Sequence, residues 1–583
     1  MAAAHDPLLV FGPRSLTYDF GDHHPLTPRR FGPGISLLEA VGATPGLEPE
    51  PATDEELAWV HTRGYVETVR RFSDEPWLPG TMGIGLSDNP AFAGMHDAAA
   101  AVAGGSLAAM RAILDGRVRH AHHPGGGLHH AMPERAWGFC IYDDPAIAIA
   151  AARRAGLRVL YVDLDVHHGD GVQAMWFDDP GVLTISFHES GRYLFPETGF
   201  PDELGRGAAA GTSVNVPFEP FAGEDAWRPV VLGLVPELAA SFGPDIVVSQ
   251  HGADAHAWDP LAHLRVTTTA QWAAARMVDA IAHRWAEGRW LATGGGGYDV
   301  YRVVPRTWAL TWLAGAHREP PPATPEAWRA RWASDARAHG QAPIPAAFLD
   351  EPNAGLPVST AQTEAERRSR ALAAAVRSVV VPAIVRAAVD RGWWRPTPEW
   401  PPASATDPTD RATPSPPGDA AVEIRTADQA LLDRAVLAAG VLPVARADDA
   451  RAILTAALDE PRTVATAALA RDHVVGLALS VDEPAAGRSL IALGVAPGYR
   501  RRGIATRLLA DHASAGHPPA TTDDAITCLV TVAERDPREP LDRTLRVQIA
   551  GRLLESAGFT RRPTPPEIAA IDREAIAMAR AAR

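Results

Sequence analysis

Four short, uninterrupted apolar runs in the first 300 residues set the narrowest limits on the fold. They are RVLYV (158–162), VLTISF (182–187), IVVS (246–249) and WLAT (290–293). Ala- and Leu-rich stretches of helical character lie between them. Strands buried on both faces of a parallel sheet have continuous apolar sequences, whereas strands with one wet face alternate. The pattern predicts an α/β fold in which helices cover both faces of a parallel sheet.

The residues that follow these runs are polar or glycine-rich. In open parallel sheets the reacting groups lie in the loops beyond the carboxyl ends of the strands. The chemistry of this chain is therefore expected in those loops.

The length of 583 residues exceeds what one hydrophobic core usually supports, so two or more domains are expected. The stretch PTPEWPPASATDPTDRATPSPPGD is rich in Pro, Ser and Thr and predicts a semi-extended, disordered linker without a core. The predicted organisation is a larger domain over 1–395, a linker over 396–420 and a smaller α/β domain over 421–583. A polar, irregular stretch and a helix from Thr360 to about Trp394 are expected at the end of the larger domain.

Composition excludes several classes of protein. The formal net charge is −15, which argues against a sequence-independent grip on nucleic acid. All 55 cationic side chains are arginines, because the chain contains no lysine. Two cysteines, Cys140 and Cys528, cannot build a disulfide framework. No apolar run long enough to span a bilayer and no secretory pattern are found, so a cytoplasmic protein without a membrane partner is expected.

The sequence YVDLDVHHGDGV places a group of metal-ligating side chains directly after RVLYV. Asp165 and His167 are two residues apart, so an extended backbone directs both to the same side. A third ligand is expected from another strand end, and SQHGADAHAWDP offers Asp254. Two carboxylates and one imidazole with an open position are typical of a catalytic divalent metal, either zinc or iron(II).

Two further glycine-rich loops carry candidate catalytic groups. GGGLHH presents the adjacent histidines His129 and His130 after a run of glycines that permits a tight backbone. ATGGGGYDV follows an apolar run and delivers Tyr298, a phenol whose proton can polarise a carbonyl. Each motif alone is compatible with an ordinary loop, but their succession at strand ends favours one active site.

These motifs resemble those of the arginase/deacetylase superfamily, specifically the histone deacetylases and the bacterial acetoin-utilisation deacetylases. GLHHA, GFC, YVDLDVHHGDGV, QHGAD and GGGGY follow one another in family order between about Tyr18 and Trp308. The form QHGADAHAWDPLAHL is most similar to the bacterial branch. The resemblance implies an arginase/deacetylase-like sheet and a zinc-dependent amidohydrolase that removes acetyl groups from amines.

The resemblance also implies roles for individual residues. Asp165, His167 and Asp254 match the family's metal ligands. His130 matches the general base and acid, with its ring oriented by Asp170.

Further roles concern charge and substrate. His129 matches a second, electrostatic histidine paired with Asp163, and Tyr298 matches the carbonyl-polarising phenol. The substrate-binding positions are Asp88 at the rim, Gly138, and the aromatic walls Phe139 and Phe195. A structural potassium ion is implied at Asp163 and Ser186. One departure is IYDD after GFC, where Asp143 replaces the family's usual Asn.

The smaller domain carries a second motif, LIALGVAPGYRRRGIATRLLADH. A strand, a turn rich in backbone donors and a helix opening at Gly503 form an anion-binding arrangement. The motif resembles the GNAT N-acetyltransferase signature, which implies acetyl-CoA as cofactor. The predicted acetyl-CoA-binding residues are Val495, Arg500, Arg501, Arg502, Gly503, Ile504 and Ala505. Leu554 stands where the family often has a tyrosine acid, so an acetyl-CoA sensor is an alternative to a second enzyme.

The leading interpretation is a bifunctional deacetylase, acting on acetyl-lysine in proteins and fused to a GNAT-like domain. The alternative substrate class is small acetylated amines such as acetylpolyamines. A non-catalytic acyl-lysine-binding module fits the complete set of catalytic residues less well. The sequence carries no signal for the oligomeric state.

Overall fold

The structure is a computed structural model that describes residues 6–86 and 88–393 and, beyond them, seven strands and residue 548. The chain divides into two compact units, the first formed mainly by residues 1–380 and the second mainly by residues 381–583. The predicted linker lies outside the described residues, so its boundaries at 396 and 420 stay predictions.

The first unit is built on an eight-stranded sheet in which every pair of neighbouring strands is parallel. The order across the sheet is β2-β1-β3-β8-β7-β4-β5-β6. The strands are β1 (Leu8–Val10), β2 (Pro45–Leu47), β3 (His120–His123), β4 (Val159–Asp163), β5 (Val182–Glu189), β6 (Ser213–Phe218), β7 (Ile246–Gln250) and β8 (Trp290–Thr293). The four apolar runs of the sequence are β4, β5, β7 and β8, so the prediction of a buried parallel sheet is confirmed.

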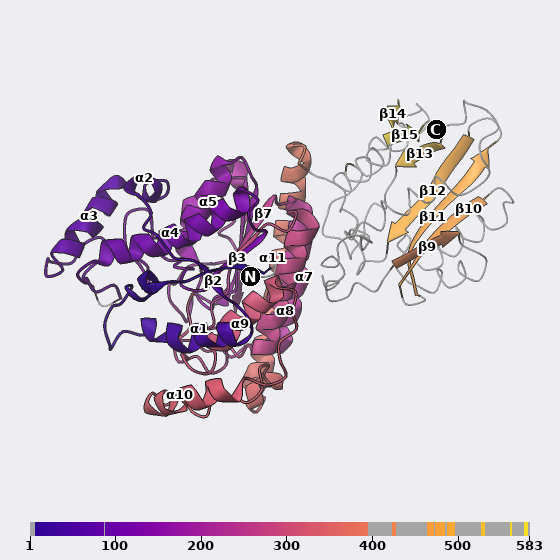
Figure 1. The fold of residues 1–583 in the computed structure, drawn as a ribbon. Helices are drawn as coiled ribbons and strands as arrows, with labels where there is room; N and C mark the ends of the chain where they lie inside the picture. Colours follow the sequence, from indigo (N-terminus) through magenta and orange to yellow (C-terminus); the bar gives the residue numbers. More distant parts are fainter. Residues whose placement is uncertain are drawn as a thin grey trace. The chain divides into compact units, whose positions relative to one another are not determined.

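Helices cover both faces of this sheet (Figure 1). α4 and α5 pack together on one side, and α8 and α9 pack together on the other. The helices are α1 (Phe31–Ala40), α2 (Asp54–Leu57), α3 (Arg63–Asp74), α4 (Met95–Leu114), α5 (Asp144–Arg154), α6 (Asp170–Trp176), α7 (Glu224–Phe242), α8 (Thr268–Trp285), α9 (Val304–Gly315), α10 (Glu326–Ala338) and α11 (Thr360–Asp390). Short 3-10 turns occur at Pro13–Leu16, Pro28–Arg30, Gly207–Ala209 and Pro352–Gly355.

Local sequence explains where the helices begin and end. α8 begins after Thr267, whose hydroxyl accepts a hydrogen bond from the backbone N–H of Ala270 at 3.2 Å. α7 ends at Gly243, which has a left-handed conformation (φ 66°) that favours glycine. The helix predicted from Thr360 is confirmed as α11, whereas the stretch before it is not wholly irregular, since it contains α10.

Two described helices, α4 and α11, are long and apolar enough to cross a membrane, which the sequence analysis did not find. α4 is rich in alanine, and 78% of its most apolar 18-residue stretch is buried inside the structure. For α11 the buried share is 44%. Burial against the sheet explains the apolar character of α4, because core helices of globular proteins pass the same test.

The second unit contains a seven-stranded sheet with the order β14-β15-β13-β12-β11-β10-β9. Its strands are β9 (Val422–Thr426), β10 (Thr463–Ala470), β11 (His473–Glu483), β12 (Gly487–Val495), β13 (Ile526–Val530), β14 (Thr560–Arg562) and β15 (Ile576–Arg580). The strand expected at the start of LIALGVAPGYRRRGIATRLLADH corresponds to β12. Neighbouring strands are antiparallel except for β12 and β13, which pair in parallel through Ser489 and Leu490.

A buried ion pair fastens the segment after α10 to the rest of the first unit. Arg306 of α9 donates to the Asp350 carboxylate at 2.7 Å, and both side chains are almost fully buried. His256 and the backbone and hydroxyl of Thr268 bind the other oxygen of Asp350 at 2.6–3.0 Å. Burial alone raises the pKa of a carboxyl group, but the contacts with His256 and Arg306 outweigh it and hold the pKa of Asp350 well below its usual range.

We expect Asp350→Asn to lower the free energy of unfolding by about 3 kcal/mol at pH 7, because it leaves the Arg306 guanidinium buried without a counter-charge. Urea unfolding followed by tryptophan fluorescence measures the change. A carboxyl group whose pKa is lower in the folded state than in the unfolded state stabilises the fold at pH values above its unfolded pKa. The difference in unfolding free energy between wild type and Asp350→Asn therefore narrows as pH falls below about 4. The exposed neighbour Glu351 provides the control Glu351→Gln, and equal midpoints for the two variants would contradict the assignment.

Candidate active site

Four neighbouring strands bring the predicted catalytic residues together. β3, β8, β7 and β4 are adjacent in the sheet, although they are third, eighth, seventh and fourth in the chain. Because the strands are parallel, their carboxyl ends share one edge. The loops at this edge carry His129 and His130 after β3, Tyr298 after β8, Asp254 after β7, and Asp165 with His167 after β4.

The predicted metal ligands form a compact, buried group. Nδ1 of His167 lies 3.2 Å from Oδ1 of Asp165 and 3.1 Å from Oδ2 of Asp254, and the three ligand atoms lie within 4.8 Å of one another. The other Asp165 oxygen accepts hydrogen bonds from the Gln250 amide at 2.7 Å and the Gly296 N–H at 2.8 Å. These contacts orient the Asp165 carboxylate toward His167 and Asp254.

The donor set fits a divalent cation. Two buried carboxylates in one small site repel each other; burial, and then the charge of Asp165, raises the pKa of Asp254 to about 6. Glycines surround them closely, since a Cβ on Gly296 would lie 1.9 Å from Oδ2 of Asp254 and one on Gly252 would lie 2.1 Å from Oδ2 of Asp165. Two carboxylates and one imidazole are ligands that zinc accepts while keeping an open position.

Each histidine of the GGGLHH loop is paired with a carboxylate. Nδ1 of His129 lies 2.8 Å from Oδ2 of Asp163, which also accepts the Tyr161 hydroxyl at 3.0 Å. Nδ1 of His130 lies 2.7 Å from Oδ1 of Asp170, and the two imidazole centroids are 4.0 Å apart. Both rings are therefore held through Nδ1, which leaves Nε2 for chemistry.

The two histidines have opposite protonation tendencies. Burial lowers the pKa of both rings, but at His129 the charges of Asp163 and Asp165 outweigh burial and raise the pKa to about 10. At His130 burial, reinforced by the neighbouring His129 charge, keeps the pKa well below its usual range. His130 is therefore the neutral ring of the pair, as a proton acceptor must be.

Tyr298 is held through its backbone. Its N–H donates to Oδ2 of Asp259 at 2.8 Å, and its carbonyl accepts from the Gln341 amide at 3.0 Å. Burial, then the nearby charges of Asp254 and Asp165, raises the pKa of the phenol well above its usual value. The hydroxyl therefore keeps its proton and can donate it in a hydrogen bond.

Aromatic rings surround these groups. Phe195 packs against His130, with centroids 5.0 Å apart, and against Trp137 at 5.1 Å. Phe139 lies 6.1 Å from Tyr298, and its backbone is left-handed (φ 67°). The preceding Gly138 (φ 50°) has room for no side chain, because a Cβ there would lie 2.7 Å from both His130 and Phe195.

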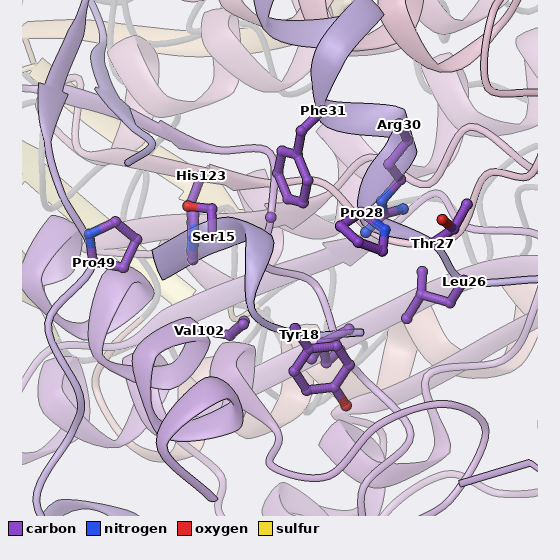
Figure 2. A pocket seen from close by; sticks show the side chains of 12 residues that line it. Ser15, Tyr18, Leu26, Thr27, Pro28, Arg30, Phe31, Pro49, Val102 and His123 are labelled. Atoms are coloured by element: carbon purple, nitrogen blue, oxygen red, sulfur yellow. The ribbon is translucent and has the colours of Figure 1, made fainter. Parts of the chain in front are cut away.

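A small cavity is lined by residues of the N-terminal segment and by His123, at the end of β3 (Figure 2). Its volume of about 20 Å³ suits one ordered water molecule. Figure 2 shows Tyr18, Arg30 and Phe31 around it. The buried Arg30 donates from Nη1 to the carbonyl of Gly295 at 2.7 Å. Burial lowers the pKa of Arg30, while the nearby Tyr298 and Asp254 oppose this shift.

Hydrogen bonds to a buried carboxylate hold the loop that bears the two histidines. Asp144 accepts hydrogen bonds from the N–H groups of Gly127 and Leu128 at 3.0 and 2.8 Å. Asp143, which replaces the family's Asn, caps α5 by accepting from Ala146 N–H at 2.8 Å. Burial raises the pKa of Asp143 well above its usual range, so a neutral carboxyl group stands in for the amide.

The remaining predicted residues lie farther out or outside the described chain. The Asp88 carbonyl accepts from His24, whose ring packs at 4.5 Å from Phe139. Ser186 is the register partner of Asp163 on β5, and its hydroxyl contacts Nδ1 of His188 at 2.8 Å. Val495 ends β12. Arg500, Arg501, Arg502, Gly503, Ile504 and Ala505 lie outside the described residues.

Sequence reasoning did not assign three residues of this site. Gln250 is the first letter of QHGAD, so the motif itself carried the signal. Asp259 follows Asp254 by five residues and could have been noted in AWDP. Arg30 is far away in the chain, in a segment without a distinctive pattern, and only folding places it beside Gly295.

Known proteins are similar to both parts of the chain. Residues 24–314 match the model of the histone deacetylase domain, and residues 437–513 match that of the acetyltransferase (GNAT) family. The acetoin utilization protein AcuC of Bacillus subtilis (strain 168) is 42% identical over 335 residues, which cover 56% of this chain and 86% of that protein. AcuC of Staphylococcus xylosus is 35% identical over 331 residues, covering 55% and 86%.

A solved structure is also similar. The crystal structure of an HDAC homolog complexed with SAHA aligns with a TM-score of 0.55 and 26% identity, covering 63% of this chain and all of that chain. The chain therefore belongs to the histone deacetylase family of hydrolases. A GNAT-type domain forms its C-terminal part. The family's fold implies a catalytic metal, and among the described residues the buried group of Asp165, His167 and Asp254 is placed so that it could hold a metal ion.

We expect Gly296→Ala to weaken metal binding by about 10–100-fold, the range found when groups that orient a ligand are disturbed. The new methyl group would overlap with Asp254 and push both carboxylates apart. Elemental analysis after dialysis measures the bound metal. Gly233→Ala on α7 is the control, because nothing lies within 4 Å of a Cβ there. Equal metal content in both variants would contradict this geometry.

Proposed function

We propose that the N-terminal domain hydrolyses acetyl-lysine in proteins. The observation that carries this proposal is the convergence of His130, Tyr298 and the buried group of Asp165, His167 and Asp254 at one edge of the sheet. The domain would work on one acetylated side chain at a time, enclosed by Phe139 and Phe195.

In this proposal Asp165, His167 and Asp254 hold a zinc ion, with iron(II) as the alternative. When bound, the metal polarises the acetyl carbonyl and makes water more acidic. His130 takes a proton on Nε2 as the water oxygen bonds to the acetyl carbon. Tyr298 donates a hydrogen bond to the carbonyl oxygen, which gains negative charge.

The second half of the reaction depends on the same proton. The C–N bond breaks, His130 returns the proton to the departing amine nitrogen, and acetate remains. Asp170 holds the His130 ring in place through both transfers. His129, paired with Asp163, supplies electrostatic stabilisation.

The surface of the loops that carry Asp88 and Phe195 favours a protein substrate. Large apolar side chains are exposed in the loop that carries Asp88 (Trp77, Met82 and Leu86), and Tyr193 is exposed in the loop that carries Phe195. Exposed apolar groups around a site commonly mark contacts with macromolecules. In this proposal Asp88 binds the substrate backbone. The alternative, acetylated polyamines, is favoured instead by the negative net charge of the chain.

Two further features belong to the same proposal. Asp163 and Ser186, side by side on β4 and β5, are proposed to contribute to a structural potassium site. The enzyme is proposed to act in the cytoplasm, without a membrane or nucleic-acid partner.

We expect His130→Ala and Tyr298→Phe each to lower kcat by at least about 100-fold while metal content stays unchanged. Acetyl-lysine peptides and acetylated polyamines are assayed in parallel, with and without chelator. Tyr301→Phe is the control, since its hydroxyl contacts His339 and not the catalytic group. Undiminished turnover in either active-site variant would overturn the mechanism. Preference for the polyamine would overturn the protein-substrate proposal alone.

For the C-terminal domain we propose acetyl-CoA binding at the end of β12. β12 pairs with β13 through Ser489 and Leu490, so within the described strands this parallel pairing stops before Val495. On its other side the end of β12 pairs with β11. Backbone donors on the β13 side of this strand end, followed by the helix that the sequence predicts to open at Gly503, suit a pyrophosphate. The domain is either an acetyltransferase or an acetyl-CoA sensor. Because the chain contains no lysine, it cannot acetylate itself on a lysine side chain.

We expect acetyl-CoA to raise the unfolding temperature of the full-length protein and to release heat in calorimetry. Gly503→Phe should abolish both effects, since a bulky side chain blocks approach to the pyrophosphate. The variant is its own control if it keeps full deacetylase activity, which depends on the other domain. Absence of any response in the wild-type protein would reject acetyl-CoA as the ligand.

A further inference from the structure

A second group of histidines and one carboxylate lies at the edge of the sheet opposite the catalytic loops. His120 is the first residue of β3, whereas the catalytic histidines follow the end of that strand. Asp279 and His283 lie one turn apart on α8, and His317 follows α9. Three separate elements therefore contribute to the group.

The ligand atoms of these four residues lie within 4.8 Å of one another. Oδ1 of Asp279 is 3.5 Å from Nε2 of His120, 3.5 Å from Nε2 of His283 and 3.2 Å from Nε2 of His317. Nε2 of His283 and Nε2 of His317 are 3.2 Å apart. The three imidazole centroids are separated by 5.0–5.5 Å, so the rings surround one point.

The protonation of His120 follows from its partner. Nδ1 of His120 lies 2.9 Å from the carbonyl of Gly315, which can only accept, so Nδ1 carries the proton. In the neutral ring Nε2 then carries a lone pair, and this atom is buried without a hydrogen-bond partner. It points at Oδ1 of Asp279, another acceptor. His120 is 5% exposed and Asp279 is fully buried.

Two acceptors that face each other at 3.5 Å repel unless a cation lies between them. A proton on Nε2 would be expected to draw the oxygen to about 2.7–2.9 Å, the length of a charge-assisted hydrogen bond. The second oxygen of Asp279 is also buried and without a hydrogen-bond partner. Oδ1 of Asp279 is within hydrogen-bond distance of Nε2 of His317. Nε2 of His120 and Oδ2 of Asp279 keep acceptor capacity for a cation.

We propose that His120, Asp279, His283 and His317 bind a divalent metal of the zinc class. In a tetrahedral site the ligand atoms are 1.6 times the metal–ligand distance apart, about 3.4 Å for zinc with nitrogen and oxygen ligands. The four distances of 3.2–3.5 Å agree with this edge length. They also match the spacing in the catalytic group, where His167 lies 3.1 and 3.2 Å from its two carboxylates.

The number of ligands separates this site from the catalytic one. Four protein ligands complete a tetrahedron and leave no position for substrate, which is the arrangement of structural zinc sites. The hydrogen bond from His120 to Gly315 is the kind of outer contact that orients a ligating imidazole. The side chains of His283 and His317 are 13% and 10% exposed, so a metal can enter from the surface.

A metal here would tie β3, α8 and the end of α9 together. β3 leads into the loop of His129 and His130, and α9 follows the loop of Tyr298. Because a structural metal binds the folded chain and not the unfolded one, its binding energy adds to stability. The site would brace the sheet about 10 Å away from the catalytic edge, the length of three residue steps in β3.

The test counts metal in the full-length protein. Wild type, Asp254→Ala, His283→Ala and the double variant are loaded with zinc, dialysed against metal-free buffer and analysed by elemental analysis. We expect two, one, one and no zinc ions per chain. His23→Ala, which removes an exposed histidine outside both groups, is the control and should keep two.

Asp254→Ala gives a readout that does not depend on deacetylation. In that background zinc should raise the unfolding temperature, and cobalt should give the visible spectrum of a tetrahedral site. Asp279→Asn, a nearly isosteric change, should lower zinc affinity at least ten-fold while far-ultraviolet circular dichroism stays unchanged. Zinc-free Asp254→Ala protein, or undiminished zinc in Asp254→Ala/His283→Ala, would overturn the proposal and leave the proposed function unaffected.

Discussion

The active site depends on the cost of burying Asp165 and Asp254 beside each other. Neither carboxylate is solvated, so each is held by donors of the protein, including the Gln250 amide and backbone N–H groups of Val166 and Gly296. These donors fix the oxygens in place but do not cancel their mutual repulsion. A divalent cation bound between them would reduce that repulsion and so add to the stability of the folded site.

The same demand explains the glycine-rich loops around the site. Chain segments approach the carboxylates so closely that a Cβ on Gly252 or Gly296 would overlap with them. The close approach excludes water and strengthens every charge interaction inside the site. It also gives the two histidines opposite pKa shifts. His129 is charged and balances Asp163, while His130 stays neutral for proton transfer.

The two edges of the sheet carry similar side chains, which we propose serve catalysis at one edge and a structural metal at the other. At the carboxyl edge Asp165, His167 and Asp254 would hold the proposed catalytic metal through three ligands and leave a position open beside His130. At the amino edge His120 and its three neighbours would supply all four ligands of the metal proposed there and leave no position for substrate. Strand β3 runs from one group to the other, so the two sites share a support without sharing a ligand.

Local sequence was enough to predict the buried strands and the shared side of Asp165 and His167, because these depend on neighbours in the chain. The catalytic roles of individual residues were implied by the resemblance to the deacetylase family and stay predictions. The tertiary structure decided which strand ends meet. β7 and β8 insert between β3 and β4, and only this order places Asp254 and Tyr298 beside the histidines. Asp279 and His317 show the same limit: they are far apart in sequence, without a shared motif, and packing of α8 and α9 against β3 alone makes them neighbours.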